Sequence, residues 1–93
     1  MPVGLLVLEL HIPEAHSLKD KRQILRGLKD RLRRKFNVAV SELEYQEVWN
    51  RSVVGVVTLS NASQHVERSL REVLDESDRV LGPLIVNHSL DIL

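Results

Sequence analysis

The stretch VGLLVLELHI at residues 3–12 decides the fold of this chain, because it is almost wholly aliphatic and ends at Pro13. Only Glu9 and His11 interrupt it. A short apolar run that ends at a proline is typical of a buried β-strand. We therefore expect a buried first strand, which the following elements must cover.

A helix is predicted over residues 18–35, soon after this strand. Ser17 is suited to cap the helix N-terminus, and Asp20 places an acid in the first turn, as in a capping box. The apolar positions of the segment fall within one arc of a helical wheel and should face the core: Leu18, Ile24, Leu25, Leu28 and Leu32.

Two further strands are predicted, at residues 37–45 and 52–60, joined as a hairpin by the polar segment 46–51. Asn61 with Gln64 forms a second capping signal, and Gly82-Pro83 ends the helix that it opens. The buried side of this helix is predicted to hold Ala62, Val66, Leu70, Val73 and Val80.

A fourth strand is predicted at residues 84–92, where apolar and polar residues alternate. One face is expected to carry Leu84, Val86, Leu90 and Ile92, and the other Asn87, Ser89 and Asp91. The order β-α-β-β-α-β and the right-handed crossover rule predict one α+β domain over residues 1–93, with a ferredoxin-like architecture. This is a two-layer sandwich of a four-stranded antiparallel sheet with two helices on one face.

The first and third strands, which are central in this arrangement, carry apolar residues on both faces. Leu5 and Val7 alternate with Leu6 and Leu8, and Val53 and Val57 with Val54 and Val56. A sheet with one face in water alternates more cleanly between apolar and polar residues. We therefore expect a homo-oligomer, a dimer or larger, in which a second copy covers the open face.

Composition excludes several classes of function. The chain has no cysteine, which rules out disulfides, thiolate catalysis and sulfur-based metal sites. Glu9 and His11 share a strand face and could in principle do acid–base chemistry or bind a metal, but neither a nucleophile nor a third ligand can be placed beside them. The four glycines fit no phosphate-binding motif. We expect a protein that is not an enzyme, with no catalytic, cofactor or metal site.

The N-terminus has no basic region followed by a cleavage site, and no apolar run approaches the length of a membrane span. We therefore expect a cytoplasmic protein that does not span a membrane.

The first predicted helix holds most of the charge asymmetry of a chain whose formal net charge is zero. Nine basic and two acidic residues lie between positions 19 and 35. Five of the cations are spaced three and four residues apart in turn, so they form one ridge about 21 Å long at 1.5 Å per residue. This basic ridge consists of Lys19, Arg22, Arg26, Lys29 and Arg33, with Arg34 beside it.

The basic ridge indicates an anionic partner, because like charges at this spacing repel by about 0.2 to 0.5 kcal/mol per pair. We expect the ridge and Arg34 to bind structured RNA or a ribosomal subunit, since arginine binds phosphate bidentately. Three alternatives remain open. The helix could dock an acidic protein, lie on an anionic membrane surface, or be a solvated helix that Glu42, Glu44, Glu47 or the acidic second helix balances.

Trp49 and Arg51 in the hairpin connection are possible further contacts. An exposed indole could stack on a base or anchor a partner, whereas the structural alternative is packing against the sheet edge.

The chain resembles the bacterial YlxP-like family, also called domain of unknown function 503. The resemblance spans most of the 93 residues, and the block at the start of the first helix is its most specific part. The segments that carry it are Val3-Gly-Leu-Leu, His11-Ile-Pro, His16-Ser-Leu-Lys-Asp-Lys-Arg22, the stretch from Leu28 to Val38, Trp49 with Arg51, Ser60-Asn61 and His65-Val66-Glu67.

This resemblance implies a ferredoxin-like fold and a bacterial cytoplasmic protein. Genes of the family commonly lie beside those for a transcription factor, an initiation factor and a ribosome-binding factor. The resemblance implies no activity and carries over no catalytic residue. Together with the basic ridge, it leads us to expect a non-enzymatic RNA-binding or ribosome-associated module, with a protein-interaction or structural domain as the alternative.

Overall fold

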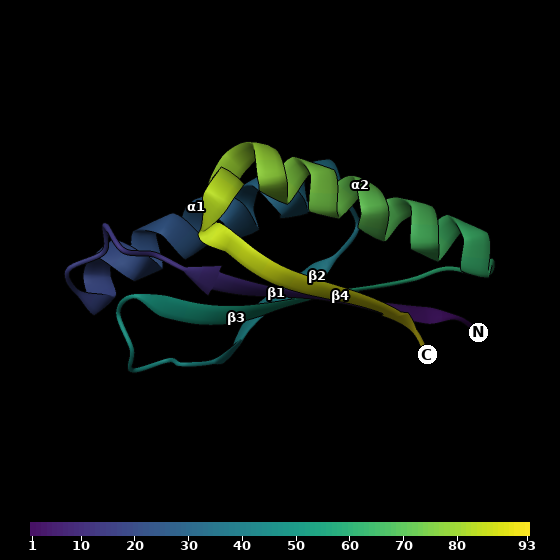
Figure 1. Cartoon of the computed structure of the whole chain (residues 1–93). Coiled ribbons are helices and arrows are strands. Elements are labelled where there is room, and N and C mark those ends of the chain that lie inside the picture. Colours follow the sequence, from purple (N-terminus) through teal and green to yellow (C-terminus); the bar gives the residue numbers. More distant parts are fainter.

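The computed structural model describes all 93 residues, and its elements follow the predicted order. They are β1 (Val3–His11), α1 (Leu18–Lys35), β2 (Ala39–Glu44), β3 (Arg51–Leu59), α2 (Ser63–Leu81) and β4 (Ile85–Ile92). The four strands form one antiparallel sheet in the order β2-β3-β1-β4. Both helices lie on the same side of this sheet (Figure 1), so the predicted ferredoxin-like sandwich is confirmed.

The core lies between the sheet and the two helices and is almost entirely aliphatic. In the register of β1 and β3, Leu6 is paired with Val56 and Leu8 with Val54, and all four side chains are fully buried. The helices cover them with Leu25, Leu28 and Leu32 of α1 and Val66, Leu70 and Val73 of α2. Each such buried side chain contributes about 1.5 to 3 kcal/mol relative to exposure.

The start of α1 agrees with the capping prediction. The hydroxyl oxygen of Ser17 accepts a hydrogen bond of 3.0 Å from the backbone N–H of Asp20. The Asp20 carboxylate in turn accepts one of 3.0 Å from the N–H of His16, so two free donors at the helix start are satisfied.

Neither α1 nor α2 combines the length and apolar character that crossing a membrane requires.

The predicted start of α2 is wrong. The N-cap position is held by Ala62, without any side-chain cap. The side-chain oxygen of Asn61 instead accepts a hydrogen bond of 3.3 Å from the Ser60 hydroxyl, and it accepts none from the N–H groups of the helix. Ala62, predicted to be buried, is exposed.

The buried side of α2 also departs from the prediction at its C-terminal end. Ser77 and Leu81 follow Val73 in steps of four and face inward, which leaves Val80 exposed. Gly82 ends the helix as predicted, because its φ of 54° lies in the left-handed region that favours glycine.

The strands differ from their predicted bounds by no more than two residues, but the alternating pattern predicted for β4 is interrupted. A short 3-10 turn, Gly82–Leu84, occupies the predicted start of this strand. The pairing with β1 then shifts register, since Glu9 is paired with Asn87 but Leu10 with Ile85. The alternation breaks at this bulge, so Val86 is 61% exposed and does not share the half-buried environment of Leu90.

Candidate functional site

The nine cations of α1 fall into two groups that the sequence does not separate. Three of them, Lys21, Arg31 and Lys35, form salt bridges with other elements of the fold. The other six form none, and they are the basic ridge together with Arg34: Lys19, Arg22, Arg26, Lys29, Arg33 and Arg34.

Lys21 is buried, with a side chain only 1% exposed, and it holds the β2–β3 connection against α1. Its ammonium group lies 2.8 Å from the Glu42 carboxylate and donates to the Tyr45 carbonyl at 2.7 Å and the Arg51 carbonyl at 3.3 Å. Ser52 donates to the same carboxylate oxygen of Glu42 at 2.6 Å. Lys21 lies on the same helix face as Leu18, Leu25 and Leu28, because these positions are three and four residues apart. This spacing could have predicted that Lys21 is buried.

Glu76 of α2 gathers the other two structural cations of α1. Its carboxylate is fully buried and lies 2.6 Å from Nε of Arg31 and 2.9 Å from Nζ of Lys35, with Arg79 of α2 at 2.8 Å. Hydrogen bonds from Arg79, Lys35 and Arg31 lower the pKa of Glu76 from 4.5 to about 2. The same contact with Glu76 raises the pKa of Arg79. This cluster ties α1 to α2, and because three cations share one carboxylate it keeps a net positive charge.

The basic ridge lies on the side of α1 that the core does not use. Lys19, Arg22, Arg26 and Arg33 are exposed and Lys29 is half-buried, while Leu25, Leu28 and Leu32 on the neighbouring side of the helix are buried. The six cations that form no salt bridge make only two side-chain hydrogen bonds, both long and both to backbone carbonyls. Arg33 donates to Val40 at 3.5 Å, and Arg34 donates to Asp30 at 3.3 Å. None of these six cations therefore has a salt-bridge partner within the chain.

A shallow groove of about 490 Å³ runs between the basic ridge and the edge strand β2. Four cations and two acids line it: Glu42 of β2 is already paired with Lys21, whereas Asp30 of α1 forms no salt bridge. The one apolar residue of the groove is Leu25, which belongs to the core. The groove is therefore basic and polar. The residues that line it are Arg22, Leu25, Arg26, Lys29, Asp30, Arg33 and Glu42.

Trp49 and Arg51 do not belong to the basic ridge. The Trp49 side chain is 50% exposed in the β2–β3 connection, so it is available to a partner. Arg51 is paired with His11 in the register of β1 and β3, which places its side chain on the sheet face away from the helices. Its guanidinium stacks on the Tyr45 ring at 4.3 Å from the centroid.

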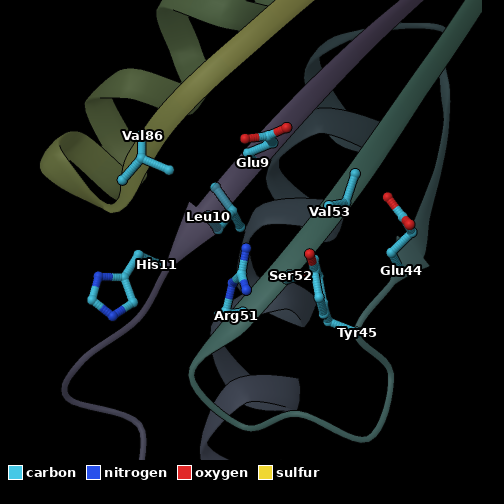
Figure 2. A pocket seen from close by; sticks show the side chains of 9 residues that line it. All are labelled: Glu9, Leu10, His11, Glu44, Tyr45, Arg51, Ser52, Val53 and Val86. Atoms are coloured by element: carbon cyan, nitrogen blue, oxygen red, sulfur yellow. The ribbon is translucent and has the colours of Figure 1, made fainter.

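Glu9 and His11 share that same outer face, as the sequence predicts. With Glu44, Tyr45 and Arg51 they line a second pocket, of about 330 Å³, at one end of the sheet (Figure 2). No three His, Asp or Glu side chains of the protein lie close enough together to hold a metal ion.

Comparisons with solved structures show the fold alone. A cofactor-independent oxygenase, SnoaB from Streptomyces nogalater, matches with a TM-score of 0.55 over 99% of this chain and 90% of its own, at 10% identity. A de novo designed protein with a ferredoxin fold matches with a TM-score of 0.56 over 100% of this chain and 83% of its own, at 9% identity. At such identities neither similarity bears on activity.

Comparisons of sequence identify the family. The uncharacterized protein YlxP of Bacillus subtilis is 38% identical over 72 residues, which cover 77% of this chain and 78% of that protein. Residues 3–83 match the family described as "Protein of unknown function (DUF503)". The chain therefore belongs to the DUF503 family, as the segments from Val3 to Glu67 predict.

Proposed function

We propose that this protein is a non-enzymatic RNA-binding module that acts in the cytoplasm, in association with the ribosome. The basic ridge and Arg34 form the binding surface. The observation that carries the proposal is the division of the α1 cations, because the fold pairs three of them and leaves six without a salt bridge along one side of the helix.

The chemistry of the six cations suits phosphate. Four of them are arginines, whose planar guanidinium groups bind phosphate bidentately. A nucleic-acid strand presents a regular row of negative charges, so a straight row of cations can neutralise several of them at once. The ridge residues are held at fixed spacing by a helix that the core anchors at Leu25, Leu28 and Leu32.

An acidic protein is the alternative partner, and the groove beside the ridge argues against it. Protein interfaces depend on buried aromatic or aliphatic anchors at their centre. Here the one apolar lining residue, Leu25, is already buried in the core. A surface that offers charge without apolar anchors fits the sugar–phosphate backbone of a nucleic acid better than it fits a folded protein.

Binding to ribosomal RNA should fall steeply with salt and should depend on the middle of the ridge. For three to five contacts with single-stranded RNA, the logarithmic slope against salt should be about −2 to −3.5. The double variant Arg22→Glu with Arg26→Glu should abolish binding measured by fluorescence anisotropy, because it reverses two central charges.

The matched control is Arg68→Glu with Arg71→Glu on α2, which makes the same change in net charge at two exposed positions. Circular dichroism should show both double variants folded. Equal RNA affinity of the two double variants, or no binding of the wild type to ribosomal subunits at low salt, would reject the proposal. Competition by an acidic polypeptide but not by RNA would instead support the protein-docking alternative.

A further inference from the structure

The open face of the sheet carries an apolar strip that no element of the chain covers. The helices lie on the other side (Figure 1), and the register turns alternate residues of β1 and β3 toward this face. Val57 is 37% exposed, Leu59 58% and Leu43 46%. Val3, Leu5 and Val7 of β1 are half-buried on the same face.

Gly55 lets Leu43 lie flat on this strip. A Cβ atom at Gly55 would come within 2.7 Å of the Leu43 side chain, so the absence of a side chain there creates the space that Leu43 fills. The bulge of β2 at Leu43 supplies the extra residue. The apolar strip therefore extends from β1 across β3 to the edge of β2.

Charges of both signs lie together at one end of the strip. Glu9 and Glu44 flank Val53 in the register, while Arg51 and His11 form the next pair along the strands (Figure 2). None of these four side chains forms a salt bridge or a hydrogen bond within the chain. Arg51 instead makes a cation–π contact with the ring of Tyr45.

We propose that the open sheet face is the interface of a homodimer in which Arg51 of each copy meets Glu9 of the other. An interface between two identical copies must be self-complementary. An apolar strip that ends in two carboxylates, a guanidinium and an imidazole meets this condition. The carboxylates disfavour a nucleic acid on this face, and the mixed charges disfavour a lipid surface.

A two-fold axis that runs parallel to the strands, between β1 and β3, gives the required arrangement. It stacks β1 of one copy on β3 of the other with the charged ends together, and aligned sheets pack about 10 Å apart. Glu9 then lies over β3 of the second copy, next to its Arg51. The dimer closes the pocket at the end of the sheet, whereas the basic ridges stay free on the two outer layers.

The size of the face limits the strength of this dimer. Strands about 4.8 Å apart, with about 3.4 Å per residue, give the four-stranded face a flat area of roughly 19 by 30 Å. Stable interfaces bury about 800 Å² per partner, so this face is at the lower end. We expect a dissociation constant in the micromolar range, and the measurement must therefore cover about 1 to 300 µM.

Sedimentation equilibrium over that range should show a monomer–dimer equilibrium. Val57→Lys with Leu59→Lys should weaken the dimer at least about 100-fold, because it places two charges among the exposed apolar side chains of the strip. A control is Val80→Lys, which also replaces an exposed valine by lysine but lies on α2 in the opposite layer, and it should leave the equilibrium unchanged. Thermal unfolding should confirm that each variant is folded.

A charge exchange tests the specific contact. Arg51→Glu alone should weaken the dimer about tenfold, and the further change Glu9→Arg should restore affinity to within about threefold of the wild type. A protein that stays monomeric to 300 µM, or a dimer that ignores Val57→Lys with Leu59→Lys, would overturn the proposal. A dimer that the charge exchange does not restore would overturn the Arg51–Glu9 contact.

Discussion

Basic residues have different roles on different sides of α1: some form salt bridges that hold the fold together, and others form none. On the inner side, Lys21 is buried in a network of oxygen atoms, and Arg31 and Lys35 converge on the buried carboxylate of Glu76. On the side beside β2, the residues of the basic ridge form no salt bridge. The difference shows that the count of positive charges on a helix does not identify a binding surface. What identifies it is the set that remains after the internal pairs are assigned.

Removing an inner cation should have the largest effect on stability. Lys21→Met leaves the carboxylate of Glu42 without its buried partner and removes the donor from the carbonyls of Tyr45 and Arg51. We expect a loss of about 3 to 5 kcal/mol in the free energy of unfolding, because breaking a buried ion pair leaves an uncompensated charge. Urea denaturation monitored by circular dichroism measures it.

Lys19→Met is the matched control two residues away, since Lys19 is exposed and unpaired. It should change the free energy of unfolding by no more than about 0.5 kcal/mol. Adding Glu42→Leu to Lys21→Met should recover part of the loss, because no buried charge then remains unpaired. A change below about 1 kcal/mol for Lys21→Met would mean that the buried network does not hold the hairpin connection.

The fold could be predicted from the sequence because its signals are local. Ser17 and Asp20 are close in the chain, and their capping bonds depend on no other element. The predictions that failed concern positions where a side-chain hydrogen bond or a strand pairing differs from what the residue types indicate. Asn61 has the residue type of a cap, but its side-chain oxygen accepts a hydrogen bond from the adjacent Ser60 hydroxyl and none from the helix. Val86 leaves the alternating pattern because the pairing of β4 with β1 shifts there.

The Glu76 cluster should have a smaller effect on stability, and one that depends on pH. Glu76→Gln removes the charge that Arg31, Lys35 and Arg79 share, yet these three side chains are more than half exposed and can turn to water. We expect the melting temperature at pH 7 to fall by roughly 5 to 10 °C. Differential scanning calorimetry measures the change.

The sign of the pH dependence follows from the lowered pKa. The pKa of Glu76 is about 2 in the folded protein instead of 4.5, so its stabilising contribution is complete above pH 4.5 and is lost as the pH falls through 2. The difference in melting temperature between the wild type and Glu76→Gln should therefore shrink from pH 4.5 to pH 2. A difference that stays constant over this range would show that the carboxylate charge is not responsible.

The candidate site could be predicted in part. The spacing of the basic ridge follows from helix geometry alone, and the structure leaves those five residues and Arg34 unpaired. The sequence could not show which cations the fold uses, because their partners are distant in the chain. Glu42 lies 21 residues after Lys21, and Glu76 lies 45 residues after Arg31. The contact of Arg51 with Tyr45 on the outer face likewise depends on the sheet register.

A single ridge cation should have the smallest effect on stability, and it should be favourable. Arg22 has Lys19 three residues before it and Arg26 four residues after it, so Arg22→Gln removes two repulsive pairs. At about 0.2 to 0.5 kcal/mol per pair, the free energy of unfolding should rise by about 0.4 to 1 kcal/mol at low salt. The gain should vanish near 1 M salt, where charges are screened beyond about 3 Å. Urea denaturation at the two salt concentrations measures it. Loss of stability at both would mean that Arg22 has a partner within the fold.

The same substitution should also weaken RNA binding. A ridge residue opposes folding and favours binding, so its removal must raise the free energy of unfolding and lower the affinity for RNA. Removal of a structural cation such as Lys21 would lower both quantities.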